Sequence, residues 1–206
     1  MLHQTPFFLP LLFPGLVWRV PTPDKLLFLT FDDGPVPGPT DAVLAILRDH
    51  AVSATFFCIG DNVRKHPDVF ERVKADGHLV GNHTRNHRNG WKTNAAAYLE
   101  NVAACDEDLG SVARVFRPPY GRITPAQVHQ LASKKIIMWD VLSRDYNSAL
   151  APADCLRGTL RAIRPGSIIV FHDSLKAEKN LLYALPRFLE GASRQGFSFA
   201  PLIHHL

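Results

Sequence analysis

The feature that most constrains the fold of this 206-residue chain is a regular alternation of short β-branched or aromatic runs with longer amphipathic stretches. Such alternation is typical of parallel sheets, in which a helix carries the chain back to the start of the next strand. About seven repeats within one chain of this length favour a closed barrel over an open sheet. We therefore predict a single-domain α/β fold of the TIM-barrel-like kind.

The expected elements follow from residue composition and from boundary signals such as Thr124-Pro125, an N-cap before a first-turn proline. The predicted strands are Leu26–Phe31, Ala54–Ile59, His78–Gly81, Arg114–Phe116, Lys135–Trp139, Ser167–Phe171 and Phe197–Pro201. The predicted helices are Thr40–His50, Pro67–Asp76, Ala95–Leu109, Pro125–Ser133, Pro152–Ile163 and Ala177–Glu190.

Composition excludes several classes of protein. Apolar residues make up 46% and charged residues 20%, close to the globular average, which excludes disorder and coiled coil. The net charge is only +4 and no Lys/Arg run accompanies it, so we expect no nucleic-acid partner. The three cysteines are widely spaced and form neither a disulfide framework nor a CxxC metal site, so each is expected to be a small buried residue.

The apolar run Phe7–Val17 is too short, and too interrupted by prolines and a glycine, to span a membrane as a helix. A secretory signal needs a basic region before the run, whereas the first basic residue, Arg19, follows it. We predict that residues 1–25 form an extended arm packed on a catalytic domain of residues 26–206. The lack of a recognisable signal favours the cytoplasm, with a degenerate export signal as the alternative.

Polar clusters follow five of the predicted strands, where barrel enzymes keep their chemistry. The clusters are Thr30–Pro35, Gly81–His87, Phe116–Gly121, Trp139–Tyr146 and Val170–Asp173. Each also has a purely structural explanation, because Asp, Gly and Pro favour turns and a strand-end His or Trp is usually structural. Together they bring carboxylates, histidines and an arginine to one face, which favours an active site.

Two of the clusters point to a metal ion. Asp32 and Asp33 repel one another unless a cation or an arginine lies between them, so one can bind metal while the other stays free as a base. His83 and His87 are four residues apart, and on a helical turn both rings face one side and can share a divalent ion. Two histidines and one carboxylate leave open positions on the ion, as expected of a catalytic rather than a structural metal.

The remaining clusters supply a fixed charge, a donor and an acid. Arg117 carries a permanent forked charge suited to a carboxylate, and the following prolines stiffen its loop. Rigid backbone at Tyr120 can present an N–H to a developing oxyanion. His172, next to an acidic partner, becomes a tunable acid.

The segments TFDDGP, HTRNH, RPPYG, WDVLSRDY and IIVFHD, in this order, resemble the five motifs of the polysaccharide deacetylases, carbohydrate esterase family 4, also called the NodB-homology domain. The resemblance runs from about Leu26 to the C-terminus. It implies a distorted (β/α)7 barrel and a metal-dependent hydrolase that removes acetyl groups from N-acetylglucosamine units of peptidoglycan or chitin-like oligomers. The implied products are acetate and a free amino sugar.

The resemblance also implies roles at the metal. One divalent ion, zinc with cobalt, nickel or manganese as alternatives, would be held by Asp33, His83 and His87. Asp32 would be the catalytic base, and Arg117 would pair with it.

On the leaving-group side, the resemblance implies that His172 is the general acid and that Asp145 orients it. Tyr120 would give its backbone N–H to the oxyanion. The family usually has Asp-Trp where this chain has Asp145-Tyr146, which changes the ring beside the acid and so the shape of the acetyl pocket or sugar platform. The residues expected to contact the sugar are Pro118, Pro119, Trp139, Tyr146 and Val170.

Three alternatives stay open. The chain could remove O-acetyl groups from acetylated xylan, hydrolyse a small non-sugar amide, or bind glycans without turnover. The presence of both Asp32 and His172 argues against the last, since a binding protein needs neither base nor acid. An acetylated glycan is the expected partner, no transmembrane segment is expected, and the sequence does not indicate an oligomeric state. A wall-polymer substrate would favour the cell envelope over the cytoplasm.

Overall fold

The strands of the protein form one parallel sheet in a computed structural model that describes residues 3–202. Seven strands are ordered β5-β4-β3-β2-β1-β7-β6, and β8 pairs with the start of β1. Their bounds are β1 Leu26–Asp32, β2 Thr55–Cys58, β3 Leu79–Asn82, β4 Val115–Phe116, β5 Lys135–Ile136, β6 Val141–Leu142, β7 Ile168–His172 and β8 Ser198–Phe199. The predicted strand over 135–139 is shorter than expected, and β6 follows it as a separate strand.

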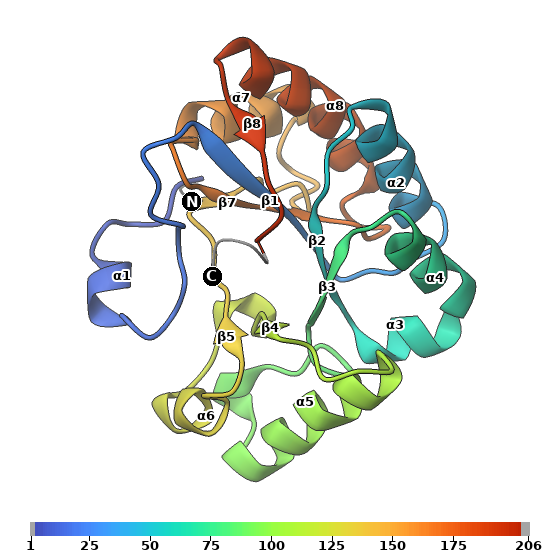
Figure 1. The fold of residues 1–206 in the computed structure, drawn as a ribbon, viewed down its shortest axis with the longest axis vertical. Coiled ribbons are helices and arrows are strands. Elements are labelled where there is room, and N and C mark those ends of the chain that lie inside the picture. The colour runs from blue at the N-terminus through green and yellow to red at the C-terminus, as the bar shows by residue number, and fades with distance from the viewer. Residues whose placement is uncertain (1–2, 203–206) are drawn as a thin grey trace.

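Helices surround this curled sheet, as the ring of coiled ribbons in Figure 1 shows. Their bounds are α1 Leu9–Leu12, α2 Pro39–Asp49, α3 Gly60–Lys65, α4 Pro67–Ala75, α5 Ala95–Asp108, α6 Pro125–Gln130, α7 Pro152–Ala162 and α8 Glu178–Arg194, with short 3₁₀ helices at Gly90–Lys92 and Pro119–Gly121. The sequence prediction lacked α1 and α3, because stretches this short carry too few residues to show helical periodicity. No helix among the described residues is long and apolar enough to cross a membrane.

The two faces of β1 pack into different apolar clusters, and this positions the site. Leu27, Leu29 and Phe31 pack outward into the large apolar cluster shared with the helices. Phe28 packs inward in a second cluster, at the centre of the barrel. Because side chains alternate along a strand, Asp32 projects to the same inner side as Phe28. Asp32, the catalytic candidate at the end of β1, therefore lies next to the interior apolar core.

Strand β7 follows the same pattern beside β1. Ile169 and Phe171 belong to the outer cluster, whereas Ile168 belongs to the inner one. Strand β7 pairs in parallel with β1, with Asp32 opposite His172. The alternation thus places His172 on the inner side as well, one strand away from Asp32.

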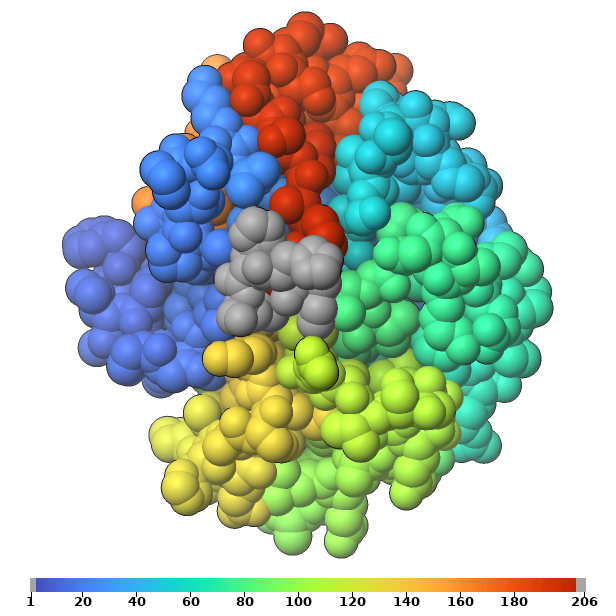
Figure 2. Space-filling view, in the orientation of Figure 1, coloured from blue at the N-terminus to red at the C-terminus, as the bar shows by residue number. Residues whose placement is uncertain are grey.

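The N-terminal segment lies in the gap between the two ends of the strand path. Val17 bridges to Ile137, next to β5, and Arg19 bridges to Ser167, just before β7. Among the described residues, no pairing between β5 and β6 closes the sheet, so the barrel is distorted as the family resemblance implies. Figures 1 and 2 show this segment in dark blue, on the side of the molecule where the ring of helices is interrupted.

A third apolar cluster attaches this segment to the domain. Leu16 and Trp18 pack there with Tyr98 and Val102 of α5 and with Met138 after β5. An extended arm is the sequence expectation for this region, yet Leu9–Leu12 forms one turn of helix instead. Pro10 is compatible with that turn, because its missing N–H falls among the first-turn groups that have no helical partner.

The burial of Trp18 leads to a stability prediction. Its side chain is 8% exposed, and Trp18→Ala should lower the free energy of unfolding by about 3 kcal/mol or more, the usual cost of deleting a buried ring. Leu11→Ala, on a side chain that is 75% exposed, should change it by less than about 0.5 kcal/mol. Denaturant titration measures both, and equally small effects would mean that the segment packs without stabilising the domain.

Candidate active site

The predicted catalytic residues meet in one cavity of about 780 Å³ at the carboxyl ends of the strands. Six of those residues line it: Asp32, Asp33, His83, His87, Tyr120 and His172. Arg117 and Asp145 do not line the cavity. They are fully buried and contact the lining residues Asp32 and His172, respectively. The structure therefore brings these predicted residues together, although their segments are up to 140 residues apart in the chain.

Asp33, His83 and His87 form a set of donors suited to one metal ion. Asp33 Oδ1 lies 3.3 Å from His87 Nε2 and 3.8 Å from His83 Nε2. The donor atoms of all three residues lie within 4.8 Å of one another, close enough to share an ion. Two imidazoles and one carboxylate are the ligands expected at a three-residue catalytic site.

The surroundings of the two histidines keep them ready to bind a cation. His83 Nδ1 is 2.7 Å from the Arg117 carbonyl and donates to it, which leaves the Nε2 lone pair facing Asp33. His87 Nδ1 lies 3.0 Å from the Tyr120 hydroxyl. Burial lowers the pKa of His83, and burial together with His83 lowers the pKa of His87 to about 4. Both rings are therefore neutral near pH 7, as metal ligands must be.

The segment 83–87 is a bend and not the helical turn that the sequence predicted. Thr84 has φ of 64° and His87 φ of 55°, so the backbone turns through left-handed conformations to bring the two rings together. Hydrogen bonds hold this shape: Thr84 N donates to Asn82 Oδ1 and Arg88 N donates to Thr84 Oγ1, each over 2.8 Å. The two rings therefore lie close together, as the spacing of four predicted, but on a bend instead of a helical turn.

Asp32 is held by a fully buried arginine. Arg117 Nη1 donates to Asp32 Oδ1 over 2.6 Å and to Thr30 Oγ1 over 2.8 Å. Burial raises the pKa of Asp32, but Arg117, with help from His83 and His172, outweighs burial and holds that pKa below its usual range. The second carboxylate oxygen, Oδ2, lies 4.0 Å from His83 Nε2 and so faces the metal donors.

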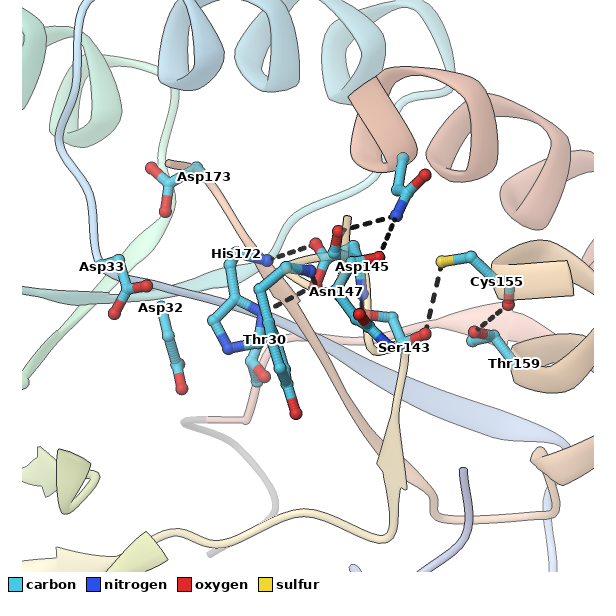
Figure 3. Close-up of polar contacts among 12 residues, drawn as sticks. Thr30, Asp32, Asp33, Ser143, Asp145, Asn147, Cys155, Thr159, His172 and Asp173 are labelled. Carbon is cyan, nitrogen blue, oxygen red and sulfur yellow. Dashed lines mark hydrogen bonds and ion pairs between the residues drawn. The ribbon is translucent and has the colours of Figure 1, made fainter. Parts of the chain in front are cut away.

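His172 is paired with a buried carboxylate on its other side. Asp145 Oδ1 lies 2.8 Å from His172 Nδ1, and Asp145 Oδ2 accepts the backbone N–H of His172 over 2.7 Å, as the two dashed contacts in Figure 3 show. Burial lowers the pKa of His172, but the charge and hydrogen bond of Asp145, with Asp33 and Asp32, raise it to about 9. His172 is therefore protonated at neutral pH.

Asp145 is itself fixed by neighbours that the sequence prediction did not include. Ser143 Oγ donates to its carboxylate over 2.9 Å. Asn180 Nδ2, from the first turn of α8, donates to the carbonyls of Asp145 and Asn147. The sequence signal available for Asn180 was an asparagine on the face of the predicted helix that is otherwise apolar and therefore expected to be buried.

Tyr120 occupies a strained turn at the rim of the cavity. Its φ of 61° and ψ of 8° are left-handed, which is costly for a residue with a side chain and is found most often at functional sites. The N–H groups of Gly121 and Arg122 donate to Pro118 and Pro119, whereas that of Tyr120 has no acceptor among the described residues. This backbone donor is free for a ligand.

The residues predicted to contact sugar divide into two groups. Trp139, Tyr146 and Val170 line the cavity, and the Tyr146 ring stands edge-on to His172 with 4.9 Å between ring centroids. Pro118 and Pro119 are buried and are absent from the lining, so their placement gives no support to a sugar contact. They shape the turn that carries Tyr120.

Asp173 is a site residue to which the sequence analysis assigned no role. Its buried carboxylate accepts the Gly34 N–H over 3.1 Å and the Thr40 hydroxyl over 2.6 Å, and so holds the loop that carries Asp33. A Cβ on Gly34 would overlap this carboxylate, which explains the glycine. The sequence signal available for Asp173 was its position directly after His172, within the segment IIVFHD.

Comparisons with known proteins agree with this site. The family model described as polysaccharide deacetylase matches residues 19–137. The chain is 35% identical to a chitooligosaccharide deacetylase of Rhizobium leguminosarum bv. trifolii over 169 residues, 73% of this chain and 72% of that protein. It is 31% identical to a peptidoglycan-N-acetylglucosamine deacetylase of Bacillus cereus over 193 residues, 89% of each.

A solved structure is similar over nearly its whole length. It is a peptidoglycan N-acetylglucosamine deacetylase in complex with 4-naphthalen-1-yl-N-oxidanyl-benzamide, with a TM-score of 0.89 and 29% identity. The similarity covers 98% of this chain and 97% of that one.

The adjacent aspartates should differ in their effect on metal affinity. Asp33→Asn removes a donor atom and should weaken zinc binding by about tenfold or more, whereas Asp32→Asn should leave the affinity nearly unchanged. Calorimetric zinc titration of both variants, after circular dichroism has shown that they are folded, tests this. Weaker binding in Asp32→Asn alone would reverse the two assignments, and equal weakening would make both residues ligands.

Proposed function

Because the chain belongs to the polysaccharide deacetylase family, we propose that it hydrolyses the acetamide of N-acetylglucosamine units in peptidoglycan or chitin-like oligomers. The products are acetate and a free amino sugar. The names of the relatives, chitooligosaccharide deacetylase and peptidoglycan-N-acetylglucosamine deacetylase, support this substrate class.

One observation carries the proposal. A carboxylate whose pKa is depressed and a histidine whose pKa is raised to about 9 line the same cavity, beside three donors for a metal ion. Two titratable groups whose pKa values are pushed apart are the pattern expected of a base and an acid that act in one reaction. A protein that only binds glycans has no use for this separation.

We assign the cation to the donors Asp33, His83 and His87, and propose zinc because nitrogen-rich three-residue sites with open positions suit it. When bound there, the cation supplies Lewis-acid polarisation of an amide carbonyl and lowers the pKa of water. Cobalt, nickel and manganese are the alternatives to be compared.

The chain's own residues then account for the proton movements. Asp32 Oδ2, free of Arg117, takes a proton from the water that attacks the acetamide carbon. The Tyr120 N–H donates a hydrogen bond to the oxygen on which negative charge develops. His172 gives its Nε2 proton to the sugar nitrogen as the carbon–nitrogen bond breaks, and Asp145 holds the resulting ring through Nδ1. The proton accepted by Asp32 and the one lost by His172 balance over the cycle.

The test is a comparison of acetate release from chitooligosaccharides, muropeptides and acetylxylan, each with and without a chelator. Release from the first two that stops with chelator and returns with zinc supports the proposal. Preference for acetylxylan would make the enzyme an O-deacetylase. Full activity after metal removal would overturn the metal-dependent mechanism.

Turnover provides a second test of the role of Asp32. Asp32→Asn is nearly isosteric but cannot accept a proton, so turnover should fall by about 10² to 10⁴ while the metal stays bound. Acetate release with zinc saturation measures this. If the variant retains more than a tenth of wild-type turnover, Asp32 is not the base.

The pH–rate profile should depend on Asp145. His172 must be protonated to act, so activity is full below its pKa of about 9 and is lost as the pH rises through that value. In Asp145→Asn burial remains and the attraction is gone, so the alkaline limb should move to lower pH. The acid limb, which depends on ionised Asp32, should stay in place.

Asp140→Asn is the matched control for that profile. Asp140 is a buried aspartate as well, but it lies just before β6 and pairs with Arg164 and Ser167, before β7, instead of with His172. Its loss should leave the alkaline limb where it is. An unmoved limb in a measurably active Asp145→Asn would show that Asp145 is not the partner of the acid.

A further inference from the structure

A second, larger cavity of about 1040 Å³ lies beside the catalytic one and has a different chemical character. The N-terminal segment forms one wall of this cavity, the apolar groove, through Leu9, Leu12 and Phe13. The region around α6 forms the other, through Ile123 and Val128. The reaction described above uses neither wall.

Hydrogen bonds hold the N-terminal wall at both ends. At the start, Thr5 N donates to the Asp140 carbonyl and Leu142 N donates to the His3 carbonyl, each over 2.8 Å. At the end, Met138 N donates to the Val17 carbonyl over 2.7 Å. Residues 6–15 therefore arch away from the domain between two fixed points, and the groove lies under the arch.

The lining offers a ligand apolar contact and few hydrogen bonds. Of the described residues that line the groove, none carries a carboxylate, ammonium or guanidinium group. The indole N–H groups of Trp18 and Trp91 donate to the carbonyls of Phe13 and Ile123, so their rings present hydrocarbon to the groove. Its polar members, His3, Gln4, Thr5, Tyr120 and His129, are a minority. A sugar hydroxyl buried here would lose hydrogen bonds to water without replacement, whereas a hydrocarbon would not.

The groove adjoins the catalytic cavity and shares part of its lining. Tyr120, Trp139 and Leu142 line both. These three side chains are therefore where a molecule with its acetamide at the metal donors would reach the groove. By contrast, the catalytic cavity is lined by charged groups that include Arg122 and Lys176.

From this juxtaposition we propose that the groove binds a hydrocarbon chain attached to the acetylated amino sugar, so that the substrate is an amphipathic glycoside. The identity of the sugar rests on the proposed function, whereas the hydrocarbon rests on the groove alone. The side chains of Leu12 and Phe13, which both line the groove, extend its apolar surface outward, being 65% and 45% exposed. A large exposed apolar patch of this kind marks a binding site more often than a bare surface.

The experiment measures binding of alkyl β-glycosides of N-acetylglucosamine, from methyl through butyl to octyl, below their micelle-forming concentrations. The three tryptophans of the chain, Trp18, Trp91 and Trp139, all line the groove, so intrinsic fluorescence reports on it directly. The Kd should fall by about two- to fourfold for each added methylene, as expected for a methylene half to fully removed from water. Acetate release from the same glycosides should show the same trend in KM.

Two neighbouring leucines give a matched pair of variants. Leu12 lines the groove and Leu11 does not, although both belong to α1 and both are exposed. Leu12→Asp should raise the Kd of the octyl glycoside by about tenfold or more, because it places a charge in the groove, and should leave the methyl glycoside unaffected. Leu11→Asp should change neither value by more than about twofold.

The outcomes distinguish this proposal from the proposed function. Binding that tightens with the length of the alkyl chain, without acetate release, would support hydrocarbon binding in the groove and overturn the proposed deacetylase activity. A Kd independent of chain length, or equal weakening by Leu11→Asp and Leu12→Asp, would overturn the groove while leaving the activity in place. Tighter binding with added sugar units instead of methylenes would make the groove a glycan subsite. If Leu12→Asp abolished a dimer in sedimentation without changing glycoside binding, a second copy of the chain would be the occupant.

Discussion

The active site depends on a guanidinium buried without any exposure at the centre of the barrel. Arg117 donates to Thr30 and Asp32 of β1 and to the carbonyls of Ile137 and Met138, after β5. A buried charge is tolerated only when it is paired and its donors are satisfied, and removal of one partner usually destabilises a protein by about 3–5 kcal/mol. The same contacts that make the charge tolerable therefore fix the position of Asp32 relative to the other side of the barrel.

The buried pairs Arg117–Asp32 and Asp145–His172 give the titratable groups of the cavity different protonation states. Arg117 keeps one carboxylate ionised although burial opposes it, and Asp145 keeps His172 protonated although burial opposes that too. At the neutral histidines between them, burial outweighs the attraction of Asp32 and Asp33, so their pKa values are lowered. Base, metal donors and acid thus differ in protonation at one pH because each has a different buried neighbour.

The N-terminal segment connects the stability of the fold with the shape of the binding surface. Its end residues complete the barrel near Ile137 and Ser167, and the arch between them encloses an apolar groove beside the site. Leu16 and Trp18 are buried, whereas Leu12 and Phe13 line the groove and are exposed. A segment that only closed the barrel would have no need of exposed apolar side chains at the groove, and this contrast is the reason to assign it a ligand.

The sequence by itself determined the parallel α/β architecture and predicted which side chains gather in the cavity. Strand alternation places Asp32 and His172 on the inner side, and this follows from residue order alone. It did not determine the bend at Thr84 and His87, the support of Gly34 by Asp173 or the burial of the two prolines. Only the tertiary structure decided these features, because each depends on contacts between segments remote in the chain, which local propensity does not report. The apolar run at the N-terminus could be seen in the sequence, but the groove beneath it exists only where that run meets α6 and Trp139 in space.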